Sequence, residues 1–226
     1  MKLIIPVIGL MLFLLACAPK TRCESPSLSQ DQCWFESATD KNRISECASI
    51  RDVTLRESCT STIAITLNSI EACQNLSLQP KSSCISTIAS NTLTAEDCVG
   101  IEDGYWRDIC LTDIGINTST HPLCKTVGSQ KLRDNCYAQI SEKTGDERVC
   151  GFVSDAASRN ACYRTLAYAR LDTGLCAFNE PAFEEDICIR KIAFLANDSS
   201  LCRKIGYVKI RENCLEKLAP PTNTII

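Results

Sequence analysis

The sequence predicts an all-α protein, a right-handed α-solenoid of about eight αα-hairpins, each 26 residues long and stapled by a disulfide. The first observation behind this prediction is the spacing of the cysteines. From Cys98 to Cys214, successive cysteines are separated alternately by 12 and 14 residues. The cysteines from Cys23 to Cys84 continue the repeat with short steps of 10, 12 and 11 residues. Repeats 1 to 8 therefore begin near residues 23, 47, 73, 98, 124, 150, 176 and 202.

The second observation is that aliphatic and small residues occupy fixed positions in each repeat. Three residues after the first cysteine stand Ile50, Leu76, Ile101, Val127, Val153 and Ile205, with Asn179 as the exception. Four residues after the second cysteine stand Ile63, Ile88, Ile114, Ile140, Leu166, Ile192 and Leu218. A small residue always follows: Ala64, Ala89, Gly115, Ser141, Ala167, Ala193 and Ala219. These spacings place cysteines and aliphatic residues on one helical face, beside which small residues would let neighbouring helices approach closely.

The third observation is that turn-forming residues divide each repeat and separate it from the next. Within repeats, helix breakers follow the first cysteine by four to seven residues: Pro80, Gly104, Gly128, Pro181 and Gly206. Between repeats lie runs such as Thr144-Gly145-Asp146. We therefore expect a short helix of about two turns, a tight loop and a longer helix of about three turns. Repeat 1, with Pro26 and a ten-residue step, is expected to be an atypical capping repeat.

The N-terminus has the features of an export signal. Lys2 precedes an apolar run from Leu3 to Leu15, which is shorter than the roughly 20 residues of a membrane-spanning helix. The run ends in Leu14-Leu15-Ala16-Cys17, which resembles the lipobox of prokaryotic lipoprotein precursors. The resemblance implies diacylglycerylation of the Cys17 thiol and cleavage just before it. The alternative is an ordinary signal peptide in which Cys17 is incidental or forms a disulfide.

The predicted organisation has four parts. Residues 1–16 form a lipoprotein signal peptide, 17–22 a lipidated tether, 23–219 the cysteine-rich repeat domain and 220–226 a disordered tail. The repeats are similar to Sel1 and tetratricopeptide helical hairpins in general class only, because the signature residues of those families are missing. No named family is therefore assigned to the repeat region.

The cysteines can pair within repeats or between them. Removing Cys17 from the 17 cysteines leaves an even number, as complete pairing requires. Pairing between repeats would leave Cys23 and Cys214 over and would displace the paired sulfurs along the hairpin. We therefore favour the within-repeat pairs Cys23–Cys33, Cys47–Cys59, Cys73–Cys84, Cys98–Cys110, Cys124–Cys136, Cys150–Cys162, Cys176–Cys188 and Cys202–Cys214.

Composition and motifs argue against several functions. A net charge of −3 does not indicate a nucleic-acid partner. The closely spaced cysteine pairs of zinc, haem and thioredoxin-like sites are missing, so we expect no metal and no cofactor. The single histidine, His121, is interpreted as a solvated turn residue. Because no catalytic motif occurs, we assign no catalytic residue and expect no enzyme.

A ladder of basic residues stands three positions before the second cysteine. Its members are Arg56, Lys81, Arg107, Arg133, Arg159 and Arg211, and Glu185 interrupts it in repeat 7. Most are followed by an acidic or amide residue, which we interpret as a countercharge. The functional interpretation is a strip for an anionic glycan, an envelope polymer or an acidic protein. The favoured structural interpretation is a set of salt bridges and carbonyl contacts between adjacent repeats.

These observations predict a non-enzymatic cell-surface lipoprotein, a disulfide-stabilised scaffold for protein or glycan interaction. We expect it outside the cytoplasm, anchored to the outer face of a membrane by lipid on Cys17, at the cell surface or in a periplasm. Its expected partners are the membrane and an envelope protein or anionic glycan, not nucleic acid. The alternatives are a thiol-active or metal-sequestering protein and a passive envelope spacer.

Overall fold

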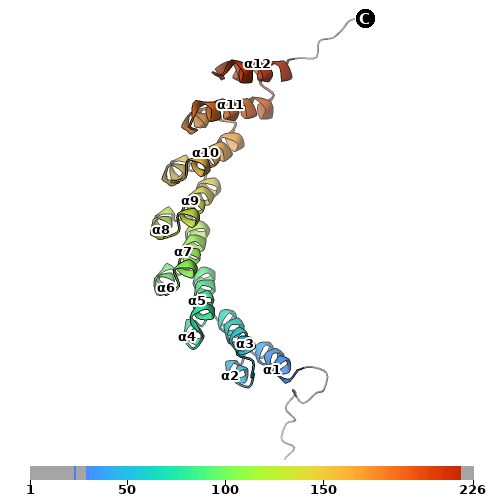
Figure 1. Ribbon diagram of the computed structural model, residues 1–226, viewed down its shortest axis with the longest axis vertical. Helices are drawn as coiled ribbons and strands as arrows, with labels where there is room; N and C mark the ends of the chain where they lie inside the picture. The colour runs from blue at the N-terminus through green and yellow to red at the C-terminus, as the bar shows by residue number, and fades with distance from the viewer. Residues whose placement is uncertain (1–22, 24–28, 220–226) are drawn as a thin grey trace, which may run out of the picture. The chain divides into compact units, whose positions relative to one another are not determined.

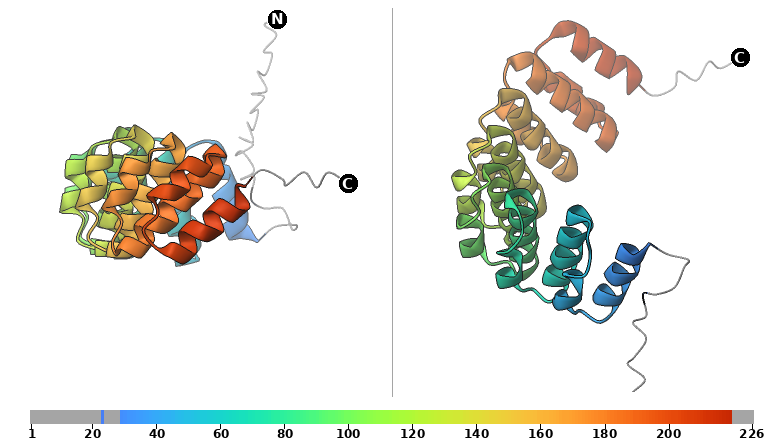
Figure 2. Two further views of the ribbon diagram at one scale, coloured as in Figure 1. Left: turned by 90° about the horizontal axis from the view of Figure 1, so that it is seen from above. Right: turned by 60° about the horizontal axis from the view of Figure 1, so that its bottom comes forward.

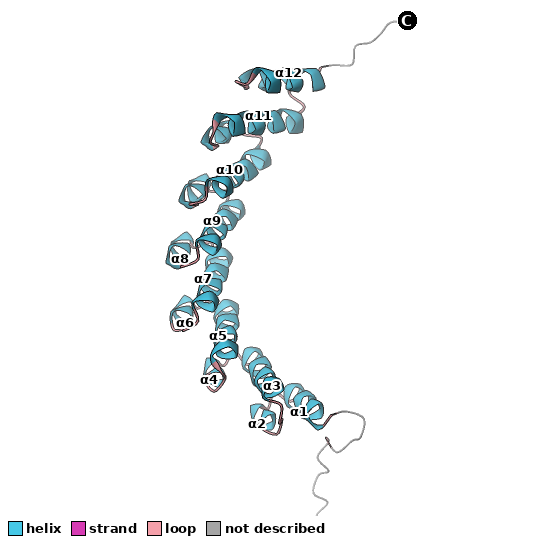
Figure 3. Cartoon of the chain, in the orientation of Figure 1, coloured by secondary structure: helices cyan, strands magenta, loops and turns pink. Residues whose placement is uncertain are grey.

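A computed structural model of the chain describes Cys23 and residues 29–219. The predicted signal peptide (1–16), the tether with Cys17 (17–22) and the tail (220–226) lie outside the described residues. The described chain forms two compact units, which divide between Ile63 and Ala64. All its regular elements are helices, and Figure 3 shows no strand in this part of the chain. The all-α prediction is therefore confirmed.

The N-terminal unit contains repeat 1 and most of repeat 2. Its helices are α1 (Gln30–Asp40), α2 (Ile44–Cys47) and the beginning of α3 (Val53–Thr66). Its core consists of Ala38, Cys47, Ile50, Cys59 and Ile63, against which the side chains of Trp34, Phe35, Ile44 and Leu55 pack. The aliphatic residues at the two fixed repeat positions are thus the centre of this core.

The C-terminal unit is a row of stacked helical hairpins. Its long helices are α5 (Leu78–Thr92), α7 (Gly104–Thr118), α9 (Gln130–Thr144), α10 (Ala156–Arg170), α11 (Ala182–Ala196) and α12 (Val208–Lys217). Its short helices are α4 (Ile70–Cys73), α6 (Ala95–Val99), α8 (His121–Thr126), η1 (Glu147–Phe152), η2 (Thr173–Phe178) and η3 (Ser199–Lys204). Consecutive long helices pack against each other, as Figures 1 and 2 show. Each of α6, α8, η1, η2 and η3 also packs against the long helices before and after it, which is solenoid stacking.

The lengths of the two helices in a hairpin differ from the prediction. The short helices have four to six residues, about one turn, and η1, η2 and η3 are 3₁₀-helices. Long helices α5, α7, α9, α10 and α11 have 15 residues, about four turns. The short helix ends early because the aliphatic residue after it takes an extended backbone, as Val153 does, and buries its side chain. The Val153 N–H still donates to the Cys150 carbonyl over 3.1 Å.

The small residues face the next repeat, as predicted. A Cβ atom added to Gly115 would lie 3.2 Å from the Cys136 Sγ and 3.5 Å from the Leu123 Cβ, both in the following hairpin. Ser141, at the equivalent position, brings its Oγ to 3.1 Å from the Cys150 Sγ. Larger side chains here would separate adjacent hairpins, because packed interiors leave little free volume.

Eight disulfides join the short and long parts of the repeats. They are the within-repeat pairs favoured from the sequence, with Cα–Cα distances of 5.2 to 6.0 Å. Each closes a loop of about a dozen residues, which by the chain-entropy estimate stabilises the fold by about 3 kcal/mol. Disulfides in such number are typical of proteins in an oxidising, extracytoplasmic compartment. None of the described helices combines the length and the apolar character needed to cross a bilayer.

The long helices that precede another repeat end in a left-handed residue, nine positions after the second cysteine. These residues are Asn42, Asn68, Leu93, Ser119, Gly145, Leu171 and Asn197. Glycine and asparagine tolerate this conformation, whereas leucine does so at a cost of about 1–2 kcal/mol. The next N–H then bonds back into the helix, as Asp172 does to the Ala167 carbonyl over 3.0 Å. The two leucines therefore hold strained backbone.

We predict that Leu171→Gly raises the free energy of unfolding by about 0.5–1 kcal/mol, because glycine removes the strain at φ 53°. Leu171 is 47% exposed, so little burial is lost. The matched control is Leu195→Gly, at a 49% exposed leucine inside α11, which should cost about 1 kcal/mol. Urea denaturation measures both, and equal losses in the two variants would contradict the strain at Leu171.

Candidate ligand-binding site

The basic ladder caps the loop of its own repeat. Nη1 of Arg56, Arg133, Arg159 and Arg211 donates to the carbonyl of the residue three positions after the first cysteine, over 3.2, 2.9, 3.1 and 3.0 Å. These carbonyl contacts lie within a repeat rather than between adjacent repeats as expected. The ladder contact that does join two repeats is Lys81 Nζ to Glu102 Oε1, at 3.5 Å. The Arg107 side chain is half-buried and has no polar partner among the described residues.

The residue after the ladder position caps the next repeat instead of neutralising the ladder. Both carboxylate oxygens of Asp134, a buried residue of α9, accept hydrogen bonds from the N–H groups of Ser154 and Asp155, over 2.8 and 2.9 Å. Asp155 is the N-cap of α10, so Asp134 clamps the start of the next long helix. We call such a residue a carboxylate clamp. The same contacts are made by Asp31, Asp108 and Asp186.

The clamp in the N-terminal unit has a measurable electrostatic signature. The N–H groups of Asp52 and Arg51 hold the pKa of Asp31 below its ordinary value of 3.8. Hydrogen bonds to a carboxylate favour its charged form. Because the folded state then binds fewer protons than the unfolded chain, this stabilisation is present above pH 3.8 and is lost as the pH falls through the lower, folded-state pKa.

Asn160 replaces the clamp aspartate where the next repeat lacks one of the two donors. In repeat 7 the N-cap of α11 is Pro181, which has no N–H. Asn160 Oδ1 accepts from the Glu180 N–H over 3.2 Å, and its Nδ2 donates to the Glu180 carbonyl over 2.6 Å. Where a carboxylate oxygen would have accepted from a second N–H, the amide Nδ2 donates to a carbonyl instead. The side chain at the clamp position therefore matches the backbone groups that it contacts.

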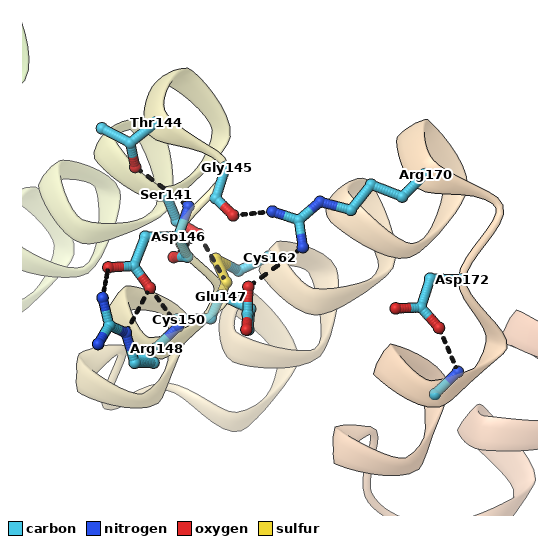
Figure 4. A network of polar contacts seen from close by, with 11 residues as sticks. Ser141, Thr144, Gly145, Asp146, Glu147, Arg148, Cys150, Cys162, Arg170 and Asp172 are labelled. Carbon is cyan, nitrogen blue, oxygen red and sulfur yellow. Dashed lines mark hydrogen bonds and ion pairs between the residues drawn. A yellow bond between two sulfur atoms is a disulfide. The ribbon is translucent and has the colours of Figure 1, made fainter.

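A polar network fixes the turn between α9 and η1 (Figure 4). Ser141 Oγ donates to the Asp146 carbonyl over 2.8 Å, and Arg170 donates to the Gly145 carbonyl. Asp146 pairs with both nitrogens of the Arg148 fork, at 2.9 and 2.8 Å, which lowers the pKa of Asp146. Glu147 pairs with Arg170 at 3.1 Å. The two acidic residues of this turn are therefore neutralised by arginines.

A pocket with a volume of about 590 Å³ opens between α8, α9 and η1. Its lining residues are His121, Pro122, Lys125, Arg133, Tyr137 and Phe152. The Phe152 ring stacks on His121, with centroids 5.5 Å apart, and lies 5.4 Å from the Tyr137 ring. Phe152 nevertheless stays 53% exposed. We call the pair Tyr137 and Phe152, with the ladder residue Arg133 beside it, the first platform.

The charge of this pocket is positive. Lys125 is exposed and Arg133 is half-buried, and neither takes part in an ion pair within the described chain. The bond from Arg133 to the Val127 carbonyl fixes the guanidinium without cancelling its charge. Burial raises the pKa of Tyr137, the positive charge of Arg133 opposes that rise, and the negative charge of Asp134 adds to it.

A second hollow, of about 680 Å³, lies between α9 and α10. Its charged lining residues include Lys131, Asp134, Glu142 and Asp155, two of which belong to the clamp. Aromatic side chains do not line it. Its mixed charge and structural residues make it a weaker candidate for a ligand site than the pocket at Phe152.

The sequence predicts only part of this site. Arg133 was predicted as a ladder residue, whereas His121 is not a solvated turn residue but stacks on an aromatic ring. Tyr137 and Phe152 were missed because they belong to different repeats and meet only when hairpins stack. Their signal is visible in the sequence, since tyrosine and phenylalanine recur 26 residues later as Tyr163 and Phe178.

Comparisons with models of protein families, with curated proteins and with solved structures found no match to this chain. Within residues 29–219 and Cys23, no group of three or more histidine, cysteine, aspartate or glutamate side chains is placed to hold a metal ion.

We predict that Asp134→Asn and Asn160→Asp each lower the free energy of unfolding by about 1–3 kcal/mol. The first substitution turns an amide N–H₂ toward an N–H donor, and the second turns a carboxylate oxygen toward the Glu180 carbonyl. Urea denaturation measures both, with the exposed Glu142→Gln in α9 as a control that should stay within about 0.5 kcal/mol. If one variant gained stability while the other lost it, net charge rather than the clamp would explain the effect.

Proposed function

We propose that this protein is a non-enzymatic, lipid-anchored extracytoplasmic scaffold that binds an anionic partner at the pocket formed by His121, Lys125, Arg133, Tyr137 and Phe152. The observation that carries this proposal is an exposed aromatic ring beside two cations that form no ion pair with any described carboxylate. Half-exposed rings and uncompensated charges stabilise a fold little, so their presence together favours a binding role.

The chemistry of the pocket suits a carboxylate, sulfate or phosphate group. Arg133 is held by the Val127 carbonyl, and its remaining N–H groups can donate to an anion. Lys125 adds an exposed ammonium at the same opening. Charge-assisted hydrogen bonds to oxyanions are about twice as strong as neutral ones. The Phe152 ring supplies apolar contact beside the charged group.

The disulfides favour a scaffold over the thiol-active alternative. All sixteen cysteines from Cys23 to Cys214 are bonded in pairs. Metal binding and thiol exchange both require a thiolate, which a disulfide sulfur is not. A passive spacer, the other alternative, needs neither the pocket nor its unpaired cations.

Lipid anchoring at Cys17 rests on the lipobox resemblance of Leu14-Leu15-Ala16-Cys17. Two acyl chains on one residue anchor a protein stably, whereas one chain binds only marginally. We predict that Cys17→Ser moves the protein from the membrane fraction to the soluble fraction, as an immunoblot of separated fractions would detect. Retention of the variant in the membrane fraction would contradict anchoring through this residue.

We predict that Lys125→Glu weakens binding of an anionic polymer by at least about tenfold, because it replaces attraction by repulsion at the pocket opening. The probes are polygalacturonate and polyglutamate, titrated calorimetrically into the full-length protein. The charge-matched control is Lys191→Glu, at an exposed lysine of α11 far from this pocket in sequence. Equal loss in the control, or no binding of either polymer to the unmodified protein, would contradict the proposed site.

A further inference from the structure

The arrangement around Phe152 recurs one repeat later. Phe178, the last residue of η2, stacks on Tyr163 of α10, with ring centroids 4.7 Å apart and an interplanar angle of 14°. Phe178 is 52% exposed, almost the same as Phe152, whereas both tyrosines are buried. Phe178 and Tyr163 follow Phe152 and Tyr137 by 26 residues, so the two pairs occupy equivalent positions of adjacent repeats.

The cation beside the ring pair recurs as well. Arg159 precedes Tyr163 by four residues, which places both on one face of α10. Its Nη1 donates to the Val153 carbonyl over 3.1 Å, as Arg133 does to the Val127 carbonyl. Burial raises the pKa of Tyr163, the positive charge of Arg159 opposes that rise, and the negative charge of Glu147 adds to it, as Arg133 and Asp134 do for Tyr137. We call Arg159, Tyr163 and Phe178 the second platform.

The charge along these two platforms is positive. Arg159, like Lys125 and Arg133, takes part in no ion pair within the described chain. Among the acidic residues near the platforms in sequence, Asp146 and Glu147 pair with arginines, and Asp134 accepts from two backbone N–H groups. Asp155 and Glu180 take part in no ion pair within the described chain. A polymer with one anionic group per building block would meet three cations here, with Asp155 and Glu180 as the nearby carboxylates outside any ion pair.

The two platforms do not continue into the repeats before and after them. The position of Phe152 and Phe178 is held by Gly100, Thr126 and Lys204 in the neighbouring repeats. The tyrosine position is held by Leu111 and Ile189. In repeat 7 the ladder cation itself is replaced by Glu185. The shared features thus define a surface of two platforms, not a property of every repeat.

The spacing of the platforms indicates the kind of polymer. Adjacent packed helices lie about 8–10 Å apart, which is about the length of a disaccharide. An extended peptide presents the same face every second residue, or about every 7 Å, which is shorter than this spacing. The flat face of a sugar ring, with its outward C–H groups, also matches the negative face of an aromatic ring.

We propose that the two platforms together bind one linear anionic polysaccharide, with sugar rings against Phe152 and Phe178 and its acidic groups against Lys125, Arg133 and Arg159. This inference rests on the proposed function, because it extends the same pocket and names its ligand class. A chain that reaches both platforms spans about three sugar rings. Once one platform has bound such a chain, its contact with the second platform is intramolecular, so the affinity should rise sharply for chains of that length.

The test measures binding of galacturonate oligomers of increasing length to the full-length protein by isothermal titration calorimetry. The hexasaccharide should bind about 100-fold more tightly than the disaccharide. Phe178→Ala should abolish this gain, because only the first platform then keeps its exposed ring. Phe178→Tyr, which keeps an aromatic ring at this position, should retain the gain and so separates loss of the ring from loss of folding.

The matched control is Phe183→Ala. Phe183 is 43% exposed and contacts Tyr207 edge to face, but the ladder residue of its helix is the acidic Glu185. This pair therefore lacks the ladder cation that the two platforms share. Loss of the Phe183 ring should change the affinity for neither the disaccharide nor the hexasaccharide. Far-UV circular dichroism and resistance of the cysteines to alkylation check that each variant keeps its fold.

The outcomes distinguish this inference from the proposed function. If disaccharide and hexasaccharide bound equally, or if Phe178→Ala left the gain intact, the second platform would be wrong, while sensitivity to Lys125→Glu would keep the pocket. If polyglutamate bound as tightly as the hexasaccharide and lost as much affinity in Phe178→Ala, the partner would be an acidic protein rather than a polysaccharide. If neither polymer bound, the pocket and the inference would fall together.

Discussion

The disulfide between the short and the long helix of repeats 2 to 8 is the constraint on which the rest of the structure depends. A helix of one turn does not persist alone, because nucleation fixes several residues for a single hydrogen bond. In η1 the disulfide Cys150–Cys162 ties such a turn to α10. Each repeat then needs only a few buried aliphatic side chains, such as Val153 and Leu166, to complete its core.

Disulfides act within repeats, and the carboxylate clamps act between them. Asp134 of α9 accepts hydrogen bonds from the N–H groups at the start of the next long helix, so the position of α10 depends on α9. Buried carboxylates are costly unless hydrogen-bonded, and here both oxygens are used. The exchange of aspartate for Asn160 opposite Pro181 shows that the clamp depends on the donors it meets, not on charge alone.

The sequence predicted the helical class and the cysteine register because both are periodic along one chain. It misjudged helix lengths, since a breaker such as Gly128 shows that a turn exists but not which residue ends the helix. The residue after the ladder position was interpreted as a countercharge, because periodicity cannot reveal that Asp108 accepts hydrogen bonds from N–H groups about 20 residues ahead. The pocket was missed for the same reason, since Tyr137 and Phe152 meet only across stacked repeats.

A repeat fold separates the residues that hold it from those that give it a surface. Cysteines and aliphatic residues recur in nearly every hairpin, and clamps recur in repeats 1 and 4 to 7, so the exposed end of a short helix is free to vary without altering the stacking. Phe152 and Phe178 use that freedom on adjacent hairpins, and each sits on a short helix fixed by a disulfide. Such a surface loses little conformational entropy when a ligand binds, which favours affinity from few contacts. The same scaffold with Glu185 and Ile189 one repeat later keeps its fold but lacks the cation and the ring, so a few side chains on a constant frame distinguish one repeat from the next.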